Sequence, residues 1–333
     1  MAEFISTFIT GFQSVVEGDL TQRFPKIKIL GLYDGLIHYR FDGDSRELEK
    51  IIYFNNTFFV LRTMKGKGLN FSFLVGSVCS SKNYFLVNKG SFRIRFVQGK
   101  QFARVAKSIT RRAEEYVLAN SKLKLDRLSP TNEIWFSIRR EGFAFCGELI
   151  SKREFTEKNL NKGELRPEIA YLICCFAKIK EDDKILEPFC GYGSIPVQLA
   201  KKFKFQKLFI SDIEAEKAAL TGSRKQISAA SEGLIDCRQA DAFSLNHIED
   251  KSISLVITDP PWGYYEEIGD IKEFYQKMFL SFNRILSDSG RMVILSARKE
   301  ELEAAVSESD FKIKNSLHTL VNGKKAGLYC IEK

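Results

Sequence analysis

KILEPFCGYGS, residues 184–194, is a short apolar stretch that runs into a glycine-rich turn, and residues typical of a helix follow it. Gly191 and Gly193 let the backbone approach a ligand closely and adopt conformations that a Cβ atom would forbid. Asp212 follows the next apolar stretch, where a carboxylate can accept hydrogen bonds from ribose hydroxyls. A strand, a glycine turn, a helix and then an acid about 20 residues on together predict a site for an adenosine-containing cofactor.

The rest of the second half alternates between strand and helix patterns, which is typical of a doubly wound parallel sheet. We expect strands at residues 184–187, 207–211, 253–258 and 290–295, and helices at residues 167–177, 194–202, 213–230 and 271–286. Residues 311–321 and 327–332 flank an Asn322-Gly323 turn and predict a terminal hairpin that adds an antiparallel strand to the sheet. The predicted fold class is therefore α/β, with a Rossmann-like domain.

Two departures from the dinucleotide pattern G-x-G-x-x-G point to the cofactor. Pro196 stands where the third glycine would be, and Glu187 stands just before the loop. A carboxylate there would repel a pyrophosphate, but it can bind the amino group of a methionine moiety. Asp241, after the strand region 236–240, is placed to bind the adenine amino group. S-adenosylmethionine therefore fits this pattern better than NAD.

A second motif, Asp259-Pro260-Pro261-Trp262, follows the strand predicted at residues 253–258, at the sheet edge where ligands bind. The two prolines stiffen the loop and remove local amide donors, so Asp259 and the Pro260 carbonyl can both accept hydrogen bonds from one exocyclic amino group. That contact aims the nitrogen lone pair at a methyl sulfonium, and Trp262 offers a face on which the base can stack. The two motifs together predict methylation of an amino group on a nucleobase.

The first 65 residues predict a βαββαβ order, which is that of a ferredoxin-like fold. The expected strands are residues 4–9, 26–32, 36–41 and 57–64, and the expected helices are residues 12–24 and one that starts at Asp44 or Ser45 and runs through Ile52. A Gly/Lys-rich joint at residues 65–68 precedes a small α+β module. This module contains a strand at 92–97, a helix through Val105 and Tyr116, and a hairpin of residues 134–138 and 143–149.

The net charge of +9 is concentrated in the first half of the 333 residues. Residues 1–165 hold 27 Lys and Arg against 17 Asp and Glu, whereas residues 166–333 hold 24 against 25. From Lys50 to Ala113 there are thirteen basic residues and no acid, a pattern that favours a polyanionic partner. The candidate RNA contacts are Arg93 and Arg95 on the outer face of a strand and a helical stripe of Arg104, Lys107, Arg111 and Arg112.

The composition is that of a globular protein, with 44% hydrophobic and 28% charged residues. The sequence has no apolar run near the roughly 18 residues of a membrane span, and no secretory signal pattern. The seven cysteines form no C-x-x-C pair, so we expect reduced thiols, no metal site and a cytoplasmic protein.

The chain resembles the THUMP-associated RNA methyltransferases, which transfer methyl groups from S-adenosylmethionine to guanosine N2. The segments that carry the resemblance are LRPEIA (165–170), EPFCGYGS (187–194), SDIE (211–214), ADAF (240–243) and DPPWG (259–263). The resemblance implies three domains: a ferredoxin-like domain at 1–65, a THUMP-like RNA-binding domain at 66–155, and a Rossmann-like methyltransferase domain at 156–333. The family more often has Tyr or Phe where Trp262 stands.

The resemblance also implies roles for individual residues. The target amine would lie against Asp259, Pro260, Pro261 and Trp262. The cofactor would be surrounded by Pro167, Glu187, Phe189, Gly191, Gly193, Asp212, Ile213, Asp241, Ala242 and Asp259.

The expected activity is guanosine-N2 methylation of tRNA, by a protein that we expect to be a monomer. Large-subunit (23S) rRNA is the nearest alternative substrate. Two further alternatives are a DNA amino-methyltransferase, which shares the D-P-P-aromatic chemistry, and a non-catalytic RNA-binding protein that retains the fold.

Overall fold

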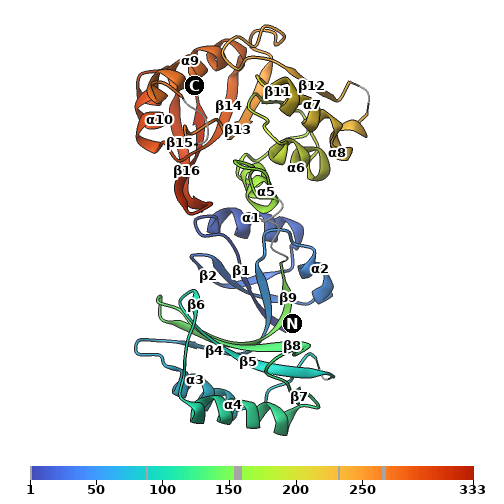
Figure 1. Ribbon diagram of the computed structural model, residues 1–333, viewed down its shortest axis with the longest axis vertical. Coiled ribbons are helices and arrows are strands. Elements are labelled where there is room, and N and C mark those ends of the chain that lie inside the picture. The colour runs from blue at the N-terminus through green and yellow to red at the C-terminus, as the bar shows by residue number, and fades with distance from the viewer. Residues whose placement is uncertain (1, 88, 154–159, 232, 265–267) are drawn as a thin grey trace. The chain divides into compact units, whose positions relative to one another are not determined.

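The computed structural model describes residues 2–87, 89–153, 160–231, 233–264 and 268–333 (Figure 1). The chain divides into unit 1, residues 1–8 and 20–154, and unit 2, residues 9–19 and 155–333. Helix α1 (Gln13–Arg23) crosses this division. Within the described residues, no helix combines the length and the apolar character needed to cross a membrane.

Unit 1 is built on one large sheet. Its strands are β1 (Ala2–Thr7), β2 (Lys28–Tyr33), β3 (Leu36–Phe41), β4 (Asn56–Lys65), β5 (Ser91–Gln98), β6 (Gln101–Phe102), β7 (Lys124–Leu125), β8 (Asn132–Ile138) and β9 (Phe143–Lys152). Its helices beyond α1 are α2 (Ser45–Glu49), α3 (Phe71–Cys79) and α4 (Lys107–Asn120).

The strand order of the sheet is β2-β3-β1-β4-β9-β8-β5-β6, with β7 paired to β5. Strands β1 to β4 pair antiparallel in the order 2-3-1-4, which is the ferredoxin-like arrangement that the sequence predicts. Strand β4 then pairs with β9, so the sheet continues from the ferredoxin-like part into the basic module. The division of residues 1–155 into two domains at residue 65 stays a prediction.

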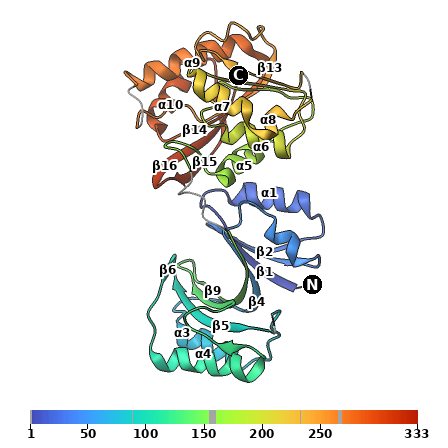
Figure 2. The same ribbon diagram turned by 45° about the vertical axis from the view of Figure 1, so that its right-hand side comes forward.

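Helices α3 and α4 lie together on one side of the sheet, beside β4, β5 and β8 (Figures 1 and 2). They enclose a core that includes Leu74, Phe92, Val117 and Phe136. Helix α3 was not predicted, although its buried residues Phe71, Leu74, Val75 and Val78 follow the helical i, i+3, i+4, i+7 spacing. The helix predicted after Asp44 is shorter than expected, since it ends at Glu49.

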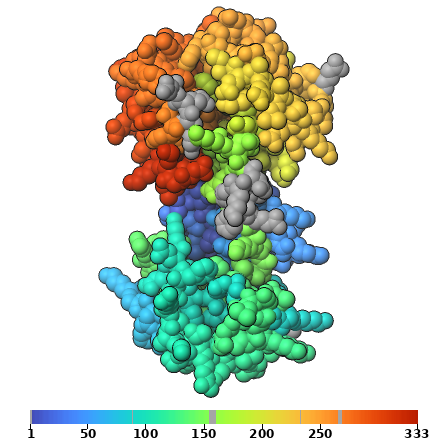
Figure 3. All heavy atoms as spheres, viewed as in Figure 1, coloured from blue at the N-terminus to red at the C-terminus, as the bar shows by residue number. Residues whose placement is uncertain are grey.

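The basic stripe predicted on one helix is only partly correct. Helix α4 begins at Lys107, so it carries Lys107, Arg111 and Arg112, whereas Arg104 precedes it. The segment before α4 is held in an extended conformation, because the Ala103 N–H donates to the Phe96 carbonyl. In the space-filling view, α4 and the neighbouring segments (teal and green) form a continuous part of the surface of unit 1 (Figure 3).

Unit 2 contains the alternating elements. Its strands are β10 (Lys184–Glu187), β11 (Lys207–Asp212), β12 (Ile235–Gln239), β13 (Ile253–Thr258), β14 (Leu286–Ser296), β15 (Lys312–Val321) and β16 (Lys324–Glu332). Its helices are α5 (Pro167–Phe176), α6 (Ser194–Lys202), α7 (Ala215–Ser223), α8 (Lys225–Ser228), α9 (Ile271–Ile285) and α10 (Lys299–Ser307).

The sheet of unit 2 has the order β12-β11-β10-β13-β14-β16-β15. Strands β10 to β14 are parallel, and β16 runs antiparallel to both β14 and β15. The order reverses beside β10, so the carboxyl ends of β10, β11 and β13 form the switch point at which open α/β sheets bind ligands. The Rossmann-like sheet and its terminal antiparallel strand are as predicted.

One prediction for the helices of unit 2 is wrong, and one helix is missing from the predictions. The helix expected at 213–230 is two short helices, since Arg224 leaves the helical conformation between α7 and α8 with ψ at 131°. Helix α10 was not predicted, although Leu302, Ala305 and Val306 bury one of its faces against the core that α9 covers.

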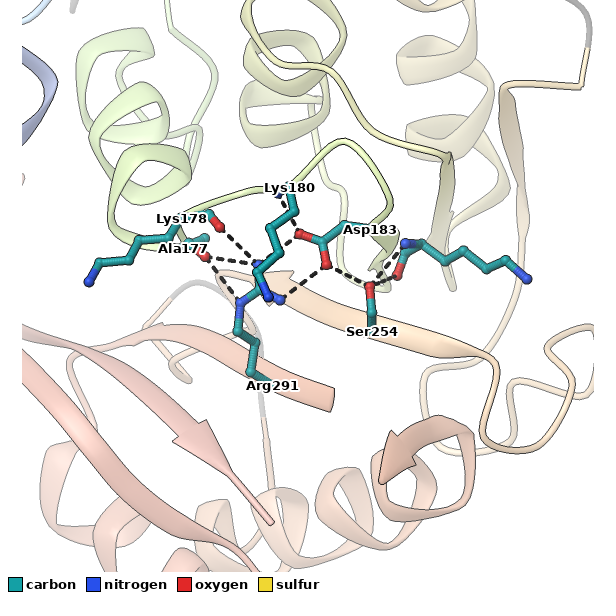
Figure 4. A network of polar contacts seen from close by, with 7 residues as sticks. Ala177, Lys178, Lys180, Asp183, Ser254 and Arg291 are labelled. Carbon is teal, nitrogen blue, oxygen red and sulfur yellow. Dashed lines mark hydrogen bonds and ion pairs between the residues drawn. The ribbon is translucent and has the colours of Figure 1, made fainter. Parts of the chain in front are cut away.

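Arg291 connects the segments at the amino ends of the parallel strands through a network of hydrogen bonds (Figure 4). Arg291 on β14 donates to both carboxylate oxygens of Asp183, at 3.1 and 2.7 Å, and to the Ala177 and Lys178 carbonyls that end α5. Asp183 also accepts from Ser254 on β13 at 2.7 Å. Burial alone would raise the pKa of Asp183, but these donors outweigh it and hold the pKa below its usual value.

We expect Arg291→Lys to lower the free energy of unfolding by about 1–2 kcal/mol, because an ammonium cannot reach the carboxylate and both carbonyls at once. Because the pKa of Asp183 is lowered, its stabilising effect is present at neutral pH and disappears on acidification, so the variant should differ least from wild type in acid. Denaturant unfolding at pH 7 and at about pH 2, well below the ordinary pKa of 3.8, measures this. Arg46→Lys, at an arginine whose side chain is 78% exposed, is the control and should change little.

Residues 9–19 belong to unit 2 although unit 1 surrounds them in the sequence. The Thr10 carbonyl accepts a hydrogen bond of 2.8 Å from Thr319 on β15. Gly11 has φ of +92°, and a Cβ atom there would lie 1.8 Å from the His318 carbonyl oxygen, so only glycine fits. Asp19 accepts hydrogen bonds from the Tyr171 hydroxyl and the Cys175 thiol of α5.

Candidate active site

A cavity of about 370 Å³ opens at the carboxyl ends of the parallel strands of unit 2. Its wall is formed by the loops after β10, β11, β12 and β13, which carry the two sequence motifs, and by the turn between β15 and β16. The motifs at residues 187–194 and 259–263 therefore meet in one site.

The glycine loop shapes the floor of this site. Gly191 has φ of +49°, and a Cβ atom added there would have no neighbour within 4 Å, so its missing side chain leaves open space on the cavity wall. Gly193 is the N-cap of α6 with φ of +86°, and a Cβ atom there would lie 2.9 Å from the Thr221 hydroxyl. Thr221 in turn donates to the Gly191 carbonyl at 3.0 Å, which holds the loop in place.

Glu187, the last residue of β10, is a buried carboxyl at the cavity. Its Oε1 accepts from the Thr258 hydroxyl at 2.8 Å, while its Oε2 is buried and has no partner within the described residues. Burial raises the pKa of Glu187 well above its usual value; the Thr258 hydrogen bond opposes that shift, and the nearby Asp259 and Asp212 add to it. This carboxylate therefore lacks a cationic partner, and a ligand with a cationic group could supply one.

Asp212 and Asp241 end the neighbouring strands. Asp212 accepts from the Gly191 N–H at 2.8 Å and from the Glu214 N–H at 3.0 Å, so its two oxygens are aimed across the mouth of the glycine loop. Asp241 follows β12 and accepts from the Phe243 N–H at 2.9 Å. Each carboxylate oxygen keeps a lone pair that can bind a ligand hydroxyl or amine.

Asp259 follows β13 and begins the Asp-Pro-Pro-Trp loop. Its Oδ1 is buried and has no partner within the described part of the chain. Burial raises the pKa of Asp259 well above its usual value, and the adjacent Trp262 opposes the shift only in part. Since unpaired buried acceptors are costly, this oxygen is suited to a donor that a ligand brings.

The Asp-Pro-Pro-Trp loop is held in place by hydrogen bonds to β14 and to the segment just before α10. The Trp262 indole donates to the Leu295 carbonyl at 3.4 Å, and the Trp262 carbonyl accepts from Arg298 Nε at 2.8 Å. The Arg298 N–H donates to the Ser296 hydroxyl, which shares a buried hydrogen bond of 2.7 Å with Tyr275. These contacts fix the position of Trp262 before any ligand binds.

Most of the sequence-predicted site residues line the cavity. They are Glu187, Phe189, Gly191, Asp212, Ile213, Asp241, Ala242, Asp259, Pro260, Pro261 and Trp262. Pro167 and Gly193 do not line it, since Pro167 starts α5 and Gly193 packs against Thr221. Their predicted role in cofactor binding thus has no support from the cavity wall.

Several residues of the cavity wall were not singled out from the sequence. They include Lys162, Tyr192, Lys217, Phe243, Tyr264, Phe274, Asn322 and Lys324. Phe243 and Tyr264 adjoin predicted motifs, so sequence proximity was a usable signal for them. Asn322 and Lys324 had no such signal, because their position depends on how the terminal hairpin pairs with β14.

The basic residues predicted to bind RNA lie in unit 1 and are of two kinds. Arg93 and Arg95 on β5 both lie beside Glu133 on β8, and Arg93 forms the closer ion pair, so Glu133 offsets one of their two charges. Arg111 is 80% exposed and pairs with Glu115, one turn along α4. Among the described residues, no group of three or more His, Cys, Asp or Glu is arranged to hold a metal ion.

The residues present fit S-adenosylmethionine. The buried and unpartnered Glu187 Oε2 would hold the cationic amino-acid end, and the open space beside Gly191 would receive the chain that follows it. Asp212 and Asp241 offer acceptors for the ribose and the adenine. Cys190 beside them is no nucleophile, because burial and the nearby Glu187 and Asp212 raise its pKa so that it stays a thiol.

Comparison with known proteins agrees with this fold. The TrmN crystal structure from Thermus thermophilus superposes with a TM-score of 0.78 over 100% of both chains at 17% identity. Among curated proteins, the U6 snRNA (guanine-N(2))-methyltransferase THUMPD2 of Mus musculus is 27% identical over 176 residues, 52% of this chain and 32% of that protein. The tRNA (guanine(10)-N2)-dimethyltransferase of Methanocaldococcus jannaschii is 26% identical over 163 residues, 45% of each protein. The chain thus matches less than half of the length of each of these two relatives, 32% and 45%.

The UPF0020 family, described as an RMKL-like methyltransferase domain, matches residues 153–326. This match covers more than half of the chain and includes both motifs and every element from α5 to β15. The chain therefore belongs to the UPF0020 family of methyltransferase domains.

Proposed function

We propose that this chain transfers a methyl group from S-adenosylmethionine to the exocyclic N2 amine of a guanosine in RNA, with tRNA as the first candidate. The observation that carries the proposal is the buried, unpartnered Asp259 Oδ1, which shares the cavity with the equally unpartnered Glu187 Oε2. One carboxyl is thus suited to an amine and the other to a cation. The names of the curated relatives, which are guanine-N2 methyltransferases of tRNA and U6 snRNA, support the same base and atom.

The chain's own residues would act by alignment. Asp259 and the Pro260 carbonyl accept hydrogen bonds from the amine and so fix the direction of its lone pair, and Trp262 stacks against the base. When bound, S-adenosylmethionine supplies an electrophilic methyl carbon. The proton that the alkylated amine releases can pass to the Asp259 carboxylate, which already accepts a hydrogen bond from that amine.

The test is methylation of a bulk RNA pool with labelled cofactor, followed by nuclease digestion and mass spectrometry. We expect N2-methylguanosine in the tRNA fraction. Ribosomal RNA and duplex DNA are offered in parallel. Label found in rRNA alone would make rRNA the substrate in place of tRNA. Methylated adenine or cytosine in duplex DNA would contradict the proposal that guanosine N2 is the methylated atom.

Unit 1 is proposed to bind the RNA, which is what a THUMP-like domain would do. Helix α4 presents Lys107, Arg111 and Arg112 on the surface, and Arg104 lies just before it. Phosphate contacts of this kind are sequence-independent and weaken with salt. Arg93 and Arg95 would contribute less, because Glu133 already offsets one of their two charges.

We expect the combined change of Arg104, Lys107, Arg111 and Arg112 to Gln to weaken tRNA binding at least about tenfold at moderate salt. The slope of log K against log salt should fall by roughly 0.7–0.9 for each phosphate that the variant no longer neutralises. Filter binding at several salt concentrations measures both. The control removes four charges from the surface of unit 2, at Lys201, Lys202, Lys204 and Lys225. Equal weakening in both variants would mean that only net charge matters.

A further inference from the structure

The turn of the terminal hairpin brings a lysine to the cavity. Asn322 and Gly323 have φ of 49° and 81°, which makes a tight turn between β15 and β16. Val321, Asn322 and Lys324 of this hairpin line the same cavity as the loop from Asp259 to Tyr264. Residues about 60 positions after the Asp-Pro-Pro-Trp motif thus complete its site.

Lys324 lies against an aromatic ring at the cavity. Its Nζ lies 3.3 Å from the centre of the Tyr264 ring, and within the described residues it forms no ion pair. The Arg298 guanidinium lies 4.8 Å from the centre of the same ring. Arg298 is committed to the loop through its hydrogen bond to the Trp262 carbonyl, and Glu301 lies 3.9 Å from it.

Two cations beside one ring repel each other, and a ring face offsets that repulsion only in part. An anion bound at Lys324 would offset the remaining repulsion between the two cations. The amide of Asn322, exposed on the same turn, can donate to that anion. A lysine on the cavity wall that forms no ion pair within the described residues, two positions from an amide donor, has the chemistry of a phosphate site.

We infer that Lys324 and Asn322 bind the backbone phosphate of the nucleotide whose base enters the cavity. This inference rests on the proposed function, because the base would lie against Asp259 and Trp262. Trp262 and Tyr264 have ring centres 6.4 Å apart, which puts the charged site next to the base and not beside the glycine loop. The carboxylates Glu187 and Asp212 would hold the cofactor, and Lys324 would hold the RNA.

The first experiment replaces Lys324 with Met, which keeps the packing on Tyr264 and removes the charge. We expect KM for tRNA to rise about 5- to 20-fold, kcat to stay within about twofold, and the salt slope of binding to fall by about one. Lys324→Arg should restore KM. Lys325→Met is the control, since Lys325 is exposed, does not line the cavity and alternates with Lys324 along β16.

The cofactor carboxylate is the other anion that Lys324 could meet, and the same variant decides between the two. The dissociation constant for S-adenosylmethionine should be unchanged in Lys324→Met. A rise in that constant with KM for tRNA unaltered would overturn the inference. So would a loss of kcat at unaltered KM, which would make Lys324 only a support for Tyr264.

A second experiment does not depend on methylation. Guanosine 5′-monophosphate and guanosine are titrated calorimetrically into the protein saturated with S-adenosylhomocysteine. The wild type should bind the monophosphate several-fold more tightly than guanosine, and Lys324→Met should lose that preference. Equal binding of the two in wild type overturns the phosphate site even if RNA is methylated. If RNA is not methylated but the preference is found, the proposed function fails and the phosphate site stands.

Discussion

Asp259→Ala is expected to lower kcat for methyl transfer by about 10²- to 10³-fold while the affinity for S-adenosylmethionine changes by less than about threefold. The buried Oδ1 of Asp259 has no partner within the described residues, so its removal costs the protein no hydrogen bond of that oxygen. The variant lacks the acceptor that would orient the target amine. Single-turnover methylation and calorimetric titration of the cofactor measure the two effects separately.

Asp259→Asn distinguishes an acceptor from a base at this position. An amide keeps one acceptor oxygen but cannot take a proton, so activity well above that of Asp259→Ala would assign the main role to orientation. The control is Asp288→Ala, at an exposed carboxylate paired with Lys251. Full activity of Asp259→Ala would refute the proposed mechanism.

Glu187→Gln is expected to act in opposite directions on binding and on stability. Loss of the negative charge should weaken binding of S-adenosylmethionine by roughly 10- to 100-fold, the range for a hydrogen bond to a charged group. The ligand-free protein should nevertheless become more stable at pH 8, because a buried carboxyl without a second partner is replaced by a neutral amide of the same shape. Calorimetric titration and thermal unfolding at pH 5 and pH 8 measure the two effects.

The sign of the pH dependence follows from the raised pKa of Glu187. The folded protein holds a proton that the unfolded chain releases above the ordinary value of 4.5, so wild-type stability falls as pH rises from there toward the folded value. The stability gained by Glu187→Gln should therefore be small at pH 5 and larger at pH 8. Cofactor affinity should follow the reverse course in wild type, rising with pH as Glu187 ionises, and should depend less on pH in the variant.

Glu148→Gln in unit 1 is the matched control. Glu148 is also fully buried with a pKa raised by burial, but its two oxygens accept from the Leu86 and Val87 N–H groups at 2.8 and 2.9 Å. An amide NH₂ would face one of those donors, so this variant should lose stability and leave cofactor affinity unchanged. Equal stability changes at Glu148 and Glu187 would contradict the account of Glu187.

The sequence predicted the parts of the fold that local signals determine. Strand β10, helix α6 and strand β13 have the predicted bounds, because glycines and prolines mark the ends of these apolar stretches. The predicted antiparallel hairpin formed around Asn322-Gly323 for the same reason. Both motifs could therefore be placed at one sheet edge from the strand order that such sequences adopt.

Features that depend on register or on distant packing could not be predicted. Glu133 neutralises Arg93 because β5 and β8 pair in parallel with those two residues opposite each other, and alternation along one strand does not reveal its neighbour. Lys324 reaches the cavity through a pairing of β16 with β14 that no local pattern encodes.

The assignment of residues 9–19 to unit 2 has a consequence for how the protein folds. The hydrogen bond between Thr319 and Thr10 joins residues 309 positions apart, so it closes one of the longest loops the chain can make. During synthesis residues 9–19 are made well before their partners on α5 and β15. The sheet of unit 1 can therefore form before the elements that residues 9–19 contact in unit 2 have been made. We expect the docking of residues 9–19 onto unit 2 to be a late and slow step in folding.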